Sequence, residues 1–141
     1  MSSYTARHRV DASPEQVWSV LPDHEGMTRW LPLRAAELEQ EGSPERDGVG
    51  AVRALHLGWP PIRERVTAFE PGRRLAYQGV GGIPARDYAG EVVLDAAGRG
   101  TDITWTVRVR PLVPGTQLVF AGVVRLLAAA LVRRVSSLPA G

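Results

Sequence analysis

Two charged residues interrupt an otherwise apolar face in the segment GAVRALHLGWPPIRERV, residues 50–66. Small or apolar residues alternate with polar ones on both sides of a Gly-Trp-Pro-Pro turn, which is typical of two half-buried strands of a hairpin. If Gly58 pairs with Pro61, Arg53 and Glu64 form a diagonal pair on the inward face. In an apolar site, Glu64 could act as acid or base while Arg53 polarises an enolate or carbonyl oxygen. The alternation therefore makes Arg53 and Glu64 the catalytic candidates.

The same two residues also have a purely structural interpretation. The register is assumed, and a slip of one residue would turn both side chains outward. A charged pair at the mouth of a cavity would be solvated and would contribute little to stability. The sequence alone leaves both interpretations open.

Aromatic residues fall on the inward face of other predicted strands. Tyr77, Tyr88 and Trp105 occupy inward positions of their strands, and Trp30 ends a short helical segment near the expected cavity entrance. Aromatic rings suit a hydrophobic ligand, and phenol oxygens could orient its polar end. The alternative is that these rings are simply core. Trp59, in the turn with two prolines, is expected to be exposed.

Other familiar catalytic patterns are missing from the sequence. His56 is placed on the outward face with Arg63 and Arg65, away from the apolar face. His8 and His24 lack the spacing of metal ligands, and the chain contains neither a Gly-x-Ser-x-Gly elbow nor a dinucleotide-binding glycine motif in context. We expect neither a metal nor a cofactor.

The composition removes several classes of chemistry. The 141-residue chain has no Cys, Lys or Asn, so thiolate nucleophiles, Schiff-base lysines and P-loop lysines are excluded. All 17 basic residues are Arg, the formal net charge is +2, and the arginines are spread along the chain. Because nucleic-acid binders concentrate basic residues in patches with aromatics, we expect no nucleic-acid partner.

The two apolar or terminal stretches that could direct the chain to a membrane have other interpretations. The N-terminal residues MSSYTARHRVDASPEQ lack the apolar centre of a signal peptide, so a cytoplasmic location is expected. The run 118–132 is too short to span a membrane and contains Arg125 at its centre. We expect a buried helix there and no transmembrane segment.

The remaining pattern predicts an α+β domain. Ser13, Pro14 and Gln16 have the spacing of a capping box and predict a helix over 14–22, and a second short helical segment ends before Pro32. The last helix, running to about Leu138, shows an apolar stripe of Val119, Val123, Leu126, Leu127 and Leu131. Period-two alternation and turn residues predict strands over 4–10, 33–41, 49–57, 61–69, 74–81, 86–95 and 101–110. A seven-stranded antiparallel sheet covered by the last helix follows.

Several segments occur in a familiar order and at familiar distances: VDASPEQVWSVLPD, MTRWLP, GVGAVR, RERVTAFEPGRRLAY, GTDITWTV and the long terminal helix. In this the chain resembles the START-like or SRPBCC superfamily, which includes polyketide cyclases, lipid-transfer domains and birch-pollen-allergen-like proteins. The resemblance extends over nearly the whole chain, and we expect residues 1–141 to form a single domain of this kind. It implies a helix-grip fold with two short helices and a deep, mostly apolar cavity between a curved sheet and the C-terminal helix.

Three functions remain open at this stage. The first is binding of a hydrophobic small molecule, such as a lipid or polyketide, by Trp30, Arg53, Glu64, Tyr77, Tyr88 and Trp105. The second is a cyclase or dehydratase reaction in the same cavity. The third is a docking module with a vestigial cavity that contacts a protein or an anionic membrane through Trp59 or through Arg133 and Arg134. The sequence specifies neither the ligand nor the oligomeric state.

Overall fold

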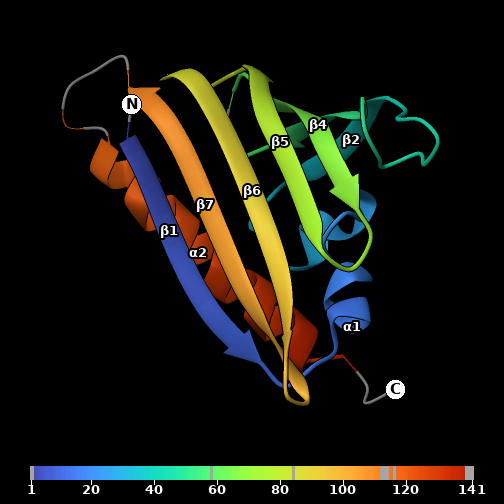
Figure 1. Cartoon of the computed structure of the whole chain (residues 1–141). Helices are drawn as coiled ribbons and strands as arrows, with labels where there is room; N and C mark the ends of the chain where they lie inside the picture. Colours follow the sequence, from blue (N-terminus) through green and yellow to red (C-terminus); the bar gives the residue numbers. More distant parts are fainter. Residues whose placement is uncertain (1, 58, 84, 112–114, 116, 139–141) are drawn as a thin grey trace.

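The computed structural model describes residues 2–57, 59–83, 85–111, 115 and 117–138. Seven strands form one antiparallel sheet in the order β1-β7-β6-β5-β4-β3-β2, and a long helix lies along one side of it (Figure 1). The elements in chain order are β1 (Ser2–Val10), α1 (Pro14–Trp18), the 3-10 helix η1 (Glu25–Arg29), β2 (Ala35–Gln40), β3 (Val52–His56), β4 (Ile62–Glu70), β5 (Arg74–Gly81), β6 (Ala85–Ala97), β7 (Gly100–Pro111) and α2 (Gln117–Ser136). The predicted curved sheet and terminal helix are confirmed.

The first helix begins as predicted but ends early. The Ser13 hydroxyl accepts a hydrogen bond from the Gln16 amide, and the Gln16 side chain accepts one from the Ser13 amide, which completes the capping box. At the other end, the Ser19 hydroxyl donates to the Gln16 carbonyl at 2.6 Å, and Pro22 disfavours helical geometry in the residue before it. The predicted helix over 14–22 is therefore shortened to α1, and the second predicted helical segment is the 3-10 helix η1.

The long helix α2 packs against β1 and β7 on the inner side of the sheet (Figure 1). Its residues in the main core recur at helical spacing: Val124, Ala128, Leu131 and Val135. The stripe predicted from sequence was wrong in its first half, because Val119, Val123 and Leu126 are exposed. Both faces of that half are apolar, so hydrophobic periodicity could not identify the inward face.

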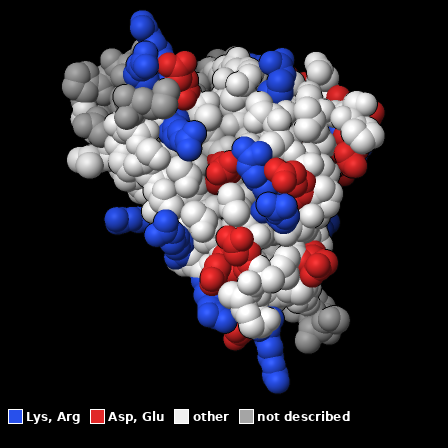
Figure 2. Space-filling view, in the orientation of Figure 1, with Lys and Arg blue, Asp and Glu red and all other residues white. Residues whose placement is uncertain are grey.

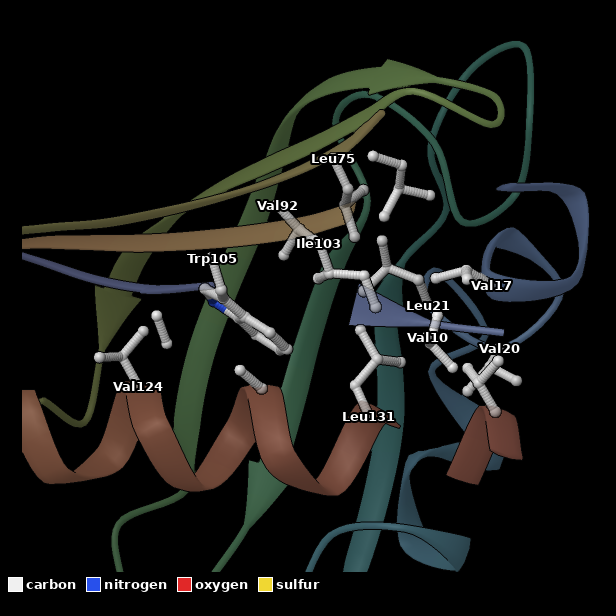
Figure 3. Packing of buried hydrophobic residues seen from close by; sticks show 14 of the residues in the cluster. Val10, Val17, Val20, Leu21, Leu75, Val92, Ile103, Trp105, Val124 and Leu131 are labelled. Atoms are coloured by element: carbon white, nitrogen blue, oxygen red, sulfur yellow. The ribbon is translucent and has the colours of Figure 1, made fainter. Parts of the chain in front are cut away.

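The core lies between the sheet and α2. Figure 3 shows the Trp105 ring there, together with Val92, Ile103, Val124 and Leu131. A second, smaller apolar cluster of Met27, Leu31, Leu55 and Ala130 joins η1 to β3 and α2. The two clusters hold η1 and α2 against the sheet and enclose the site described below.

The outer face of the sheet carries charges of both signs. Acidic and basic side chains are intermingled over β4, β5 and β6 (Figure 2), including the contacts of Arg74 with Glu70 and Glu91. Within the described ranges, no helix combines the length and apolarity needed to cross a membrane.

Candidate functional site

Arg53 on β3 and Glu64 on β4 face each other directly across the two strands. The observed pairing also joins Leu55 to Ile62, which is two residues away from the register predicted from a pairing of Gly58 with Pro61. Gly58 itself lies outside the described residues. A shift of two residues keeps the same faces inward, so the diagonal pair becomes a direct one on the predicted face.

The Arg53–Glu64 pair is buried rather than solvated. Glu64 Oε1 accepts hydrogen bonds from Arg53 Nε at 3.2 Å and Nη2 at 3.0 Å. Each residue is only 5% exposed. The Arg53 guanidinium carbon also lies 5.4 Å from the centroid of the Tyr77 ring, a cation–π distance. The sheet thus holds one charged, hydrogen-bonded pair inside an apolar interior.

Tyr77 connects this pair to Trp105. Trp105 Nε1 donates a hydrogen bond to Tyr77 Oη at 3.0 Å. Gly90 is the cross-strand partner of Tyr77, and the phenol lies over the position that a Cβ of Gly90 would occupy. A side chain at that position would displace the ring, so glycine is required for Tyr77 to reach Trp105.

Tyr88 lies beside Tyr77 rather than in the wall of the cavity. Its ring centroid is 6.1 Å from that of Tyr77 and 6.2 Å from that of Phe120. A Cβ on Gly79 would be only 2.9 Å from the Tyr88 ring, so a second glycine makes room for a second tyrosine. The two tyrosine rings therefore pack together over the backbone of β5 and β6, where Gly79 and Gly90 leave space for them.

Both phenols are held in the protonated form. Burial raises the pKa of Tyr77, and the negative charge of Glu64 raises it further. Burial likewise raises the pKa of Tyr88 well above its usual range, with smaller contributions from Tyr77 and Glu64. Each phenol can therefore act as a hydrogen-bond donor next to the ion pair across the ordinary pH range.

Arg53, Glu64, Tyr77 and Trp105 meet at a largely apolar cavity of about 40 Å³. Trp30 closes it, and its Nε1 is buried with no hydrogen-bond partner among the described residues. All of the sequence-predicted ligand residues line the cavity except Tyr88, which contributes through Tyr77. The volume suits a few water molecules, whereas pockets that hold small-molecule ligands measure about 300–1,000 Å³. The lining residues are Leu21, Met27, Trp30, Leu31, Arg53, Leu55, Glu64, Leu75, Tyr77, Val92, Trp105 and Leu127.

Sequence reasoning missed two sets of contributors. Met27 and Leu31 form a wall of the cavity from η1 and its C-terminal end, although the sequence indicated only that a short helical segment lay there. Gly79 and Gly90 interrupt predicted strands, and a glycine within a strand is a signal of close approach by another group. That signal could have identified Gly79 and Gly90 as the positions against which the two tyrosine rings pack.

The histidines lie away from the cavity lining. His56 Nε2 is 3.7 Å from Glu37 Oε1 and forms no hydrogen bond with the described residues. His24 is buried and its Nδ1 contacts Asp47 Oδ1, which fastens the start of η1 to the loop after β2. The structure brings no three potential metal ligands together in the described part of the chain. Trp59, at 86% exposure, is on the surface as predicted.

Solved structures from several bacteria share this architecture. A START superfamily protein from Mycobacterium smegmatis superimposes with a TM-score of 0.82 at 18% identity, over 97% of this chain and 99% of that one. XoxI from Bacillus cereus gives 0.78 at 20% identity over 97% of both chains. CalU16 from Micromonospora echinospora gives 0.71 at 24% identity, over 96% of this chain and 76% of that one. These similarities show the START-like helix-grip fold.

Two comparisons concern sequence. No curated protein matches the chain. Residues 1–138 match the family described as "Polyketide cyclase / dehydrase and lipid transport", which covers β1 through α2 and includes every residue of the cavity. The protein therefore belongs to the polyketide cyclase / dehydrase and lipid transport family, and it has the fold of the START superfamily protein from Mycobacterium smegmatis.

Proposed function

We propose that the protein binds an apolar small molecule that carries a polar group, and that this group is held by Arg53, Glu64 and Tyr77. The observation that carries the proposal is the buried ion pair in the wall of an apolar cavity. Replacing a buried ion pair by apolar residues of similar volume is often neutral or stabilising, so stability alone gives little reason for the pair. A ligand that hydrogen-bonds to Arg53 and Glu64 would explain why a charged pair is present in this apolar interior.

The described cavity must widen to admit such a ligand, since about 40 Å³ is too small for a lipid or polyketide. Its two sides differ in how firmly they are held. Five hydrogen-bonded strands, β3 to β7, form one side, and α2 contributes Leu127. Met27, Trp30 and Leu31 on the other side belong to a single short 3-10 segment and its end. We assign the movement to η1, because displacing it breaks no sheet hydrogen bonds.

Besides the packing of Met27 and Leu31, two polar contacts hold η1 in place, one buried and one at the surface. His24 contacts Asp47, and Arg46 Nη1 lies 3.0 Å from Glu25 Oε1. Arg46 and Glu25 are more than half exposed, so their ion pair contributes little to stability. The wall formed by η1 lacks the hydrogen-bond ladders of the sheet and is therefore the more easily displaced of the two.

The test uses N-phenyl-1-naphthylamine, a neutral apolar dye that becomes fluorescent in apolar surroundings. We expect the wild-type protein to bind it and Val92→Phe to lose binding, because Val92 is fully buried and lines the cavity. Val93→Phe is the matched control, since it places the same ring one residue along β6 on the opposite face.

Equal dye binding by wild type and Val92→Phe would contradict the cavity as the binding site. Absence of dye binding, together with salt-dependent binding to anionic vesicles or a protein, would instead favour the docking-module interpretation. Circular dichroism and thermal melting of both variants check that each is folded, because overpacking a core costs about 1–3 kcal/mol.

A second candidate function is proton transfer in the same cavity, as in a cyclase or dehydratase. It is favoured by the contact of the Glu64 carboxylate with Arg53, beside two phenols kept protonated by burial. Glu64 would remove a proton from a carbon between two carbonyl groups, and Arg53 and Tyr77 would stabilise the enolate oxygen.

A simple 1,3-diketone in D₂O tests this second candidate. Wild-type protein should accelerate exchange of the central C–H for deuterium, as followed by NMR, and Glu64→Gln should abolish the acceleration. The same exchange rate in both proteins would remove Glu64 from a catalytic role.

A further inference from the structure

A surface hollow of about 310 Å³ lies on the outer side of Trp30, where η1 meets the C-terminal part of α2. Three arginines line it: Arg29 comes from η1, and Arg133 and Arg134 come from the last turn of α2. Ala130 and Ser137 complete its wall. Residues more than a hundred positions apart in sequence thus bring three positive charges to one concavity.

The three arginines are not neutralised by neighbouring carboxylates. None of them forms a salt bridge with a described residue, whereas Arg53, Arg63 and Arg74 each have an acidic partner within 3.2 Å. An adjoining hollow of about 110 Å³ shares Arg29, Trp30 and Arg134, and Asp23 is the acidic residue that lines it. The charge of the two hollows together is therefore positive and suits an anion.

The helix end explains only part of this arrangement. Arg133 and Arg134 lie where the partial negative charge of the α2 C-terminus favours cations. That effect gives no reason for Arg29, which belongs to a different element, to lie in the same hollow.

Trp30 separates the basic hollow from the internal cavity and lines both of them. Its Nε1 is buried and has no hydrogen-bond partner among the described residues. A buried N–H without an acceptor lowers stability, which favours a ligand that brings an acceptor to this point. An anion at the arginines, joined to an apolar tail in the cavity, would pass directly by this indole.

We infer that the hollow is the portal of the cavity, and that Arg29, Arg133 and Arg134 bind the anionic end, a carboxylate or a phosphate, of an acidic amphiphile. The inference rests on the proposed function and narrows the ligand class from any apolar molecule to one with an anionic head. The tail lies in the widened cavity, and a further polar group on it faces Arg53 and Tyr77.

The experiment compares octanoate with octan-1-ol, which share an alkyl tail and differ in the anionic head. Each is titrated into ¹⁵N-labelled full-length protein and followed by NMR. We expect octanoate to bind more tightly than octan-1-ol and to shift the Trp30 indole N–H resonance. In the triple variant Arg29→Gln/Arg133→Gln/Arg134→Gln, octanoate should bind about tenfold more weakly, because each exposed ion pair contributes only modestly, while octan-1-ol should be unaffected.

Arg125→Gln is the matched control. Arg125 is an exposed arginine of α2 that lies outside the hollow, so its replacement removes one charge without changing the portal. It should leave octanoate binding unchanged. Raising the salt concentration should weaken the binding of octanoate and not that of octan-1-ol.

Each other outcome overturns the portal in a distinguishable way. If both ligands bind equally to wild type and triple variant and Val92→Phe abolishes both, the cavity is confirmed and the portal is wrong. If octanoate binding needs the arginines but tolerates Val92→Phe, the hollow is an isolated anion site. If vesicles containing phosphatidylglycerol bind through the arginines while octanoate does not, the surface recognises a membrane. If neither ligand binds and no apolar dye binds, the proposed function and the portal fail together.

Discussion

Removing one partner of the buried Arg53–Glu64 pair should destabilise the protein far more than removing both. Glu64→Leu leaves Arg53 as an unpaired charge at 5% exposure, and such a change costs about 3–5 kcal/mol. Arg53→Met leaves Glu64 in the same situation. In a chain of 141 residues, this loss corresponds to a fall in Tm of about 10–15 °C.

The double variant Arg53→Met/Glu64→Leu removes both charges and fills similar volume. Its Tm should return to within about 4 °C of the wild type or exceed it, because no unpaired charge remains. The double-mutant cycle should therefore give a coupling free energy of several kcal/mol. Thermal melting and urea titration, both followed by circular dichroism, measure it.

A neighbouring surface pair provides the control. Arg63 Nε lies 2.8 Å from Glu39 Oε1, and the side chains of Arg63 and Glu39 are 41% and 37% exposed. Glu39→Leu should lower the free energy of unfolding by less than about 1 kcal/mol. If Glu64→Leu costs no more than Glu39→Leu, the inner pair is hydrated in solution and the reasoning from burial is wrong.

The remaining predictions concern Gly90 beneath the Tyr77 ring, the two buried phenols and the first helix. Gly90→Ala should displace Tyr77 and lower stability by about 1–3 kcal/mol, whereas Gly122→Ala, with open space around it on α2, should raise stability by about 0.5–1 kcal/mol; thermal melts that show the same sign for both would refute this. Because burial raises the pKa of Tyr77 and Tyr88, the folded state holds these protons more tightly than the unfolded state, so stability should fall as the pH rises above about 10. Absorbance at 295 nm should show their ionisation only at still higher pH or on unfolding, and ionisation of all three tyrosines with a midpoint near pH 10 in the native state would contradict the burial. Ser13→Ala should cost about 1 kcal/mol in urea titrations by removing the N-cap of α1, and an unchanged midpoint would show that the capping box contributes nothing.

The fold was readable from the sequence because its signals were local and repeated. The capping box at Ser13 marked the start of α1, and alternation such as that around Trp105 marked the strands. Cross-strand register was less accessible, since it depends on the length of each turn. The Arg53–Glu64 pairing was therefore two residues from its predicted position, although the face was right.

On the side formed by the sheet the site could be predicted well, whereas on the side of η1 the sequence indicated only Trp30. Period-two alternation identifies inward residues such as Tyr77 without knowledge of their neighbours. The positions of Met27 and Leu31 depend on how η1 packs against β3 and α2, and no local sequence pattern encodes that packing. The same limit applies to the convergence of Arg29 with Arg133, because sequence separation conceals it.

The central claim is that the cavity holds an apolar small molecule, and native mass spectrometry of freshly purified protein tests it most directly. Wild-type protein should carry a discrete adduct that organic solvent extracts, and Val93→Phe should retain it. Val92→Phe should appear at the mass of the bare chain, because its ring fills the cavity. An adduct of equal abundance on Val92→Phe, or a bare wild-type chain that takes up no lipid, sterol or polyketide when these are added, would contradict the account.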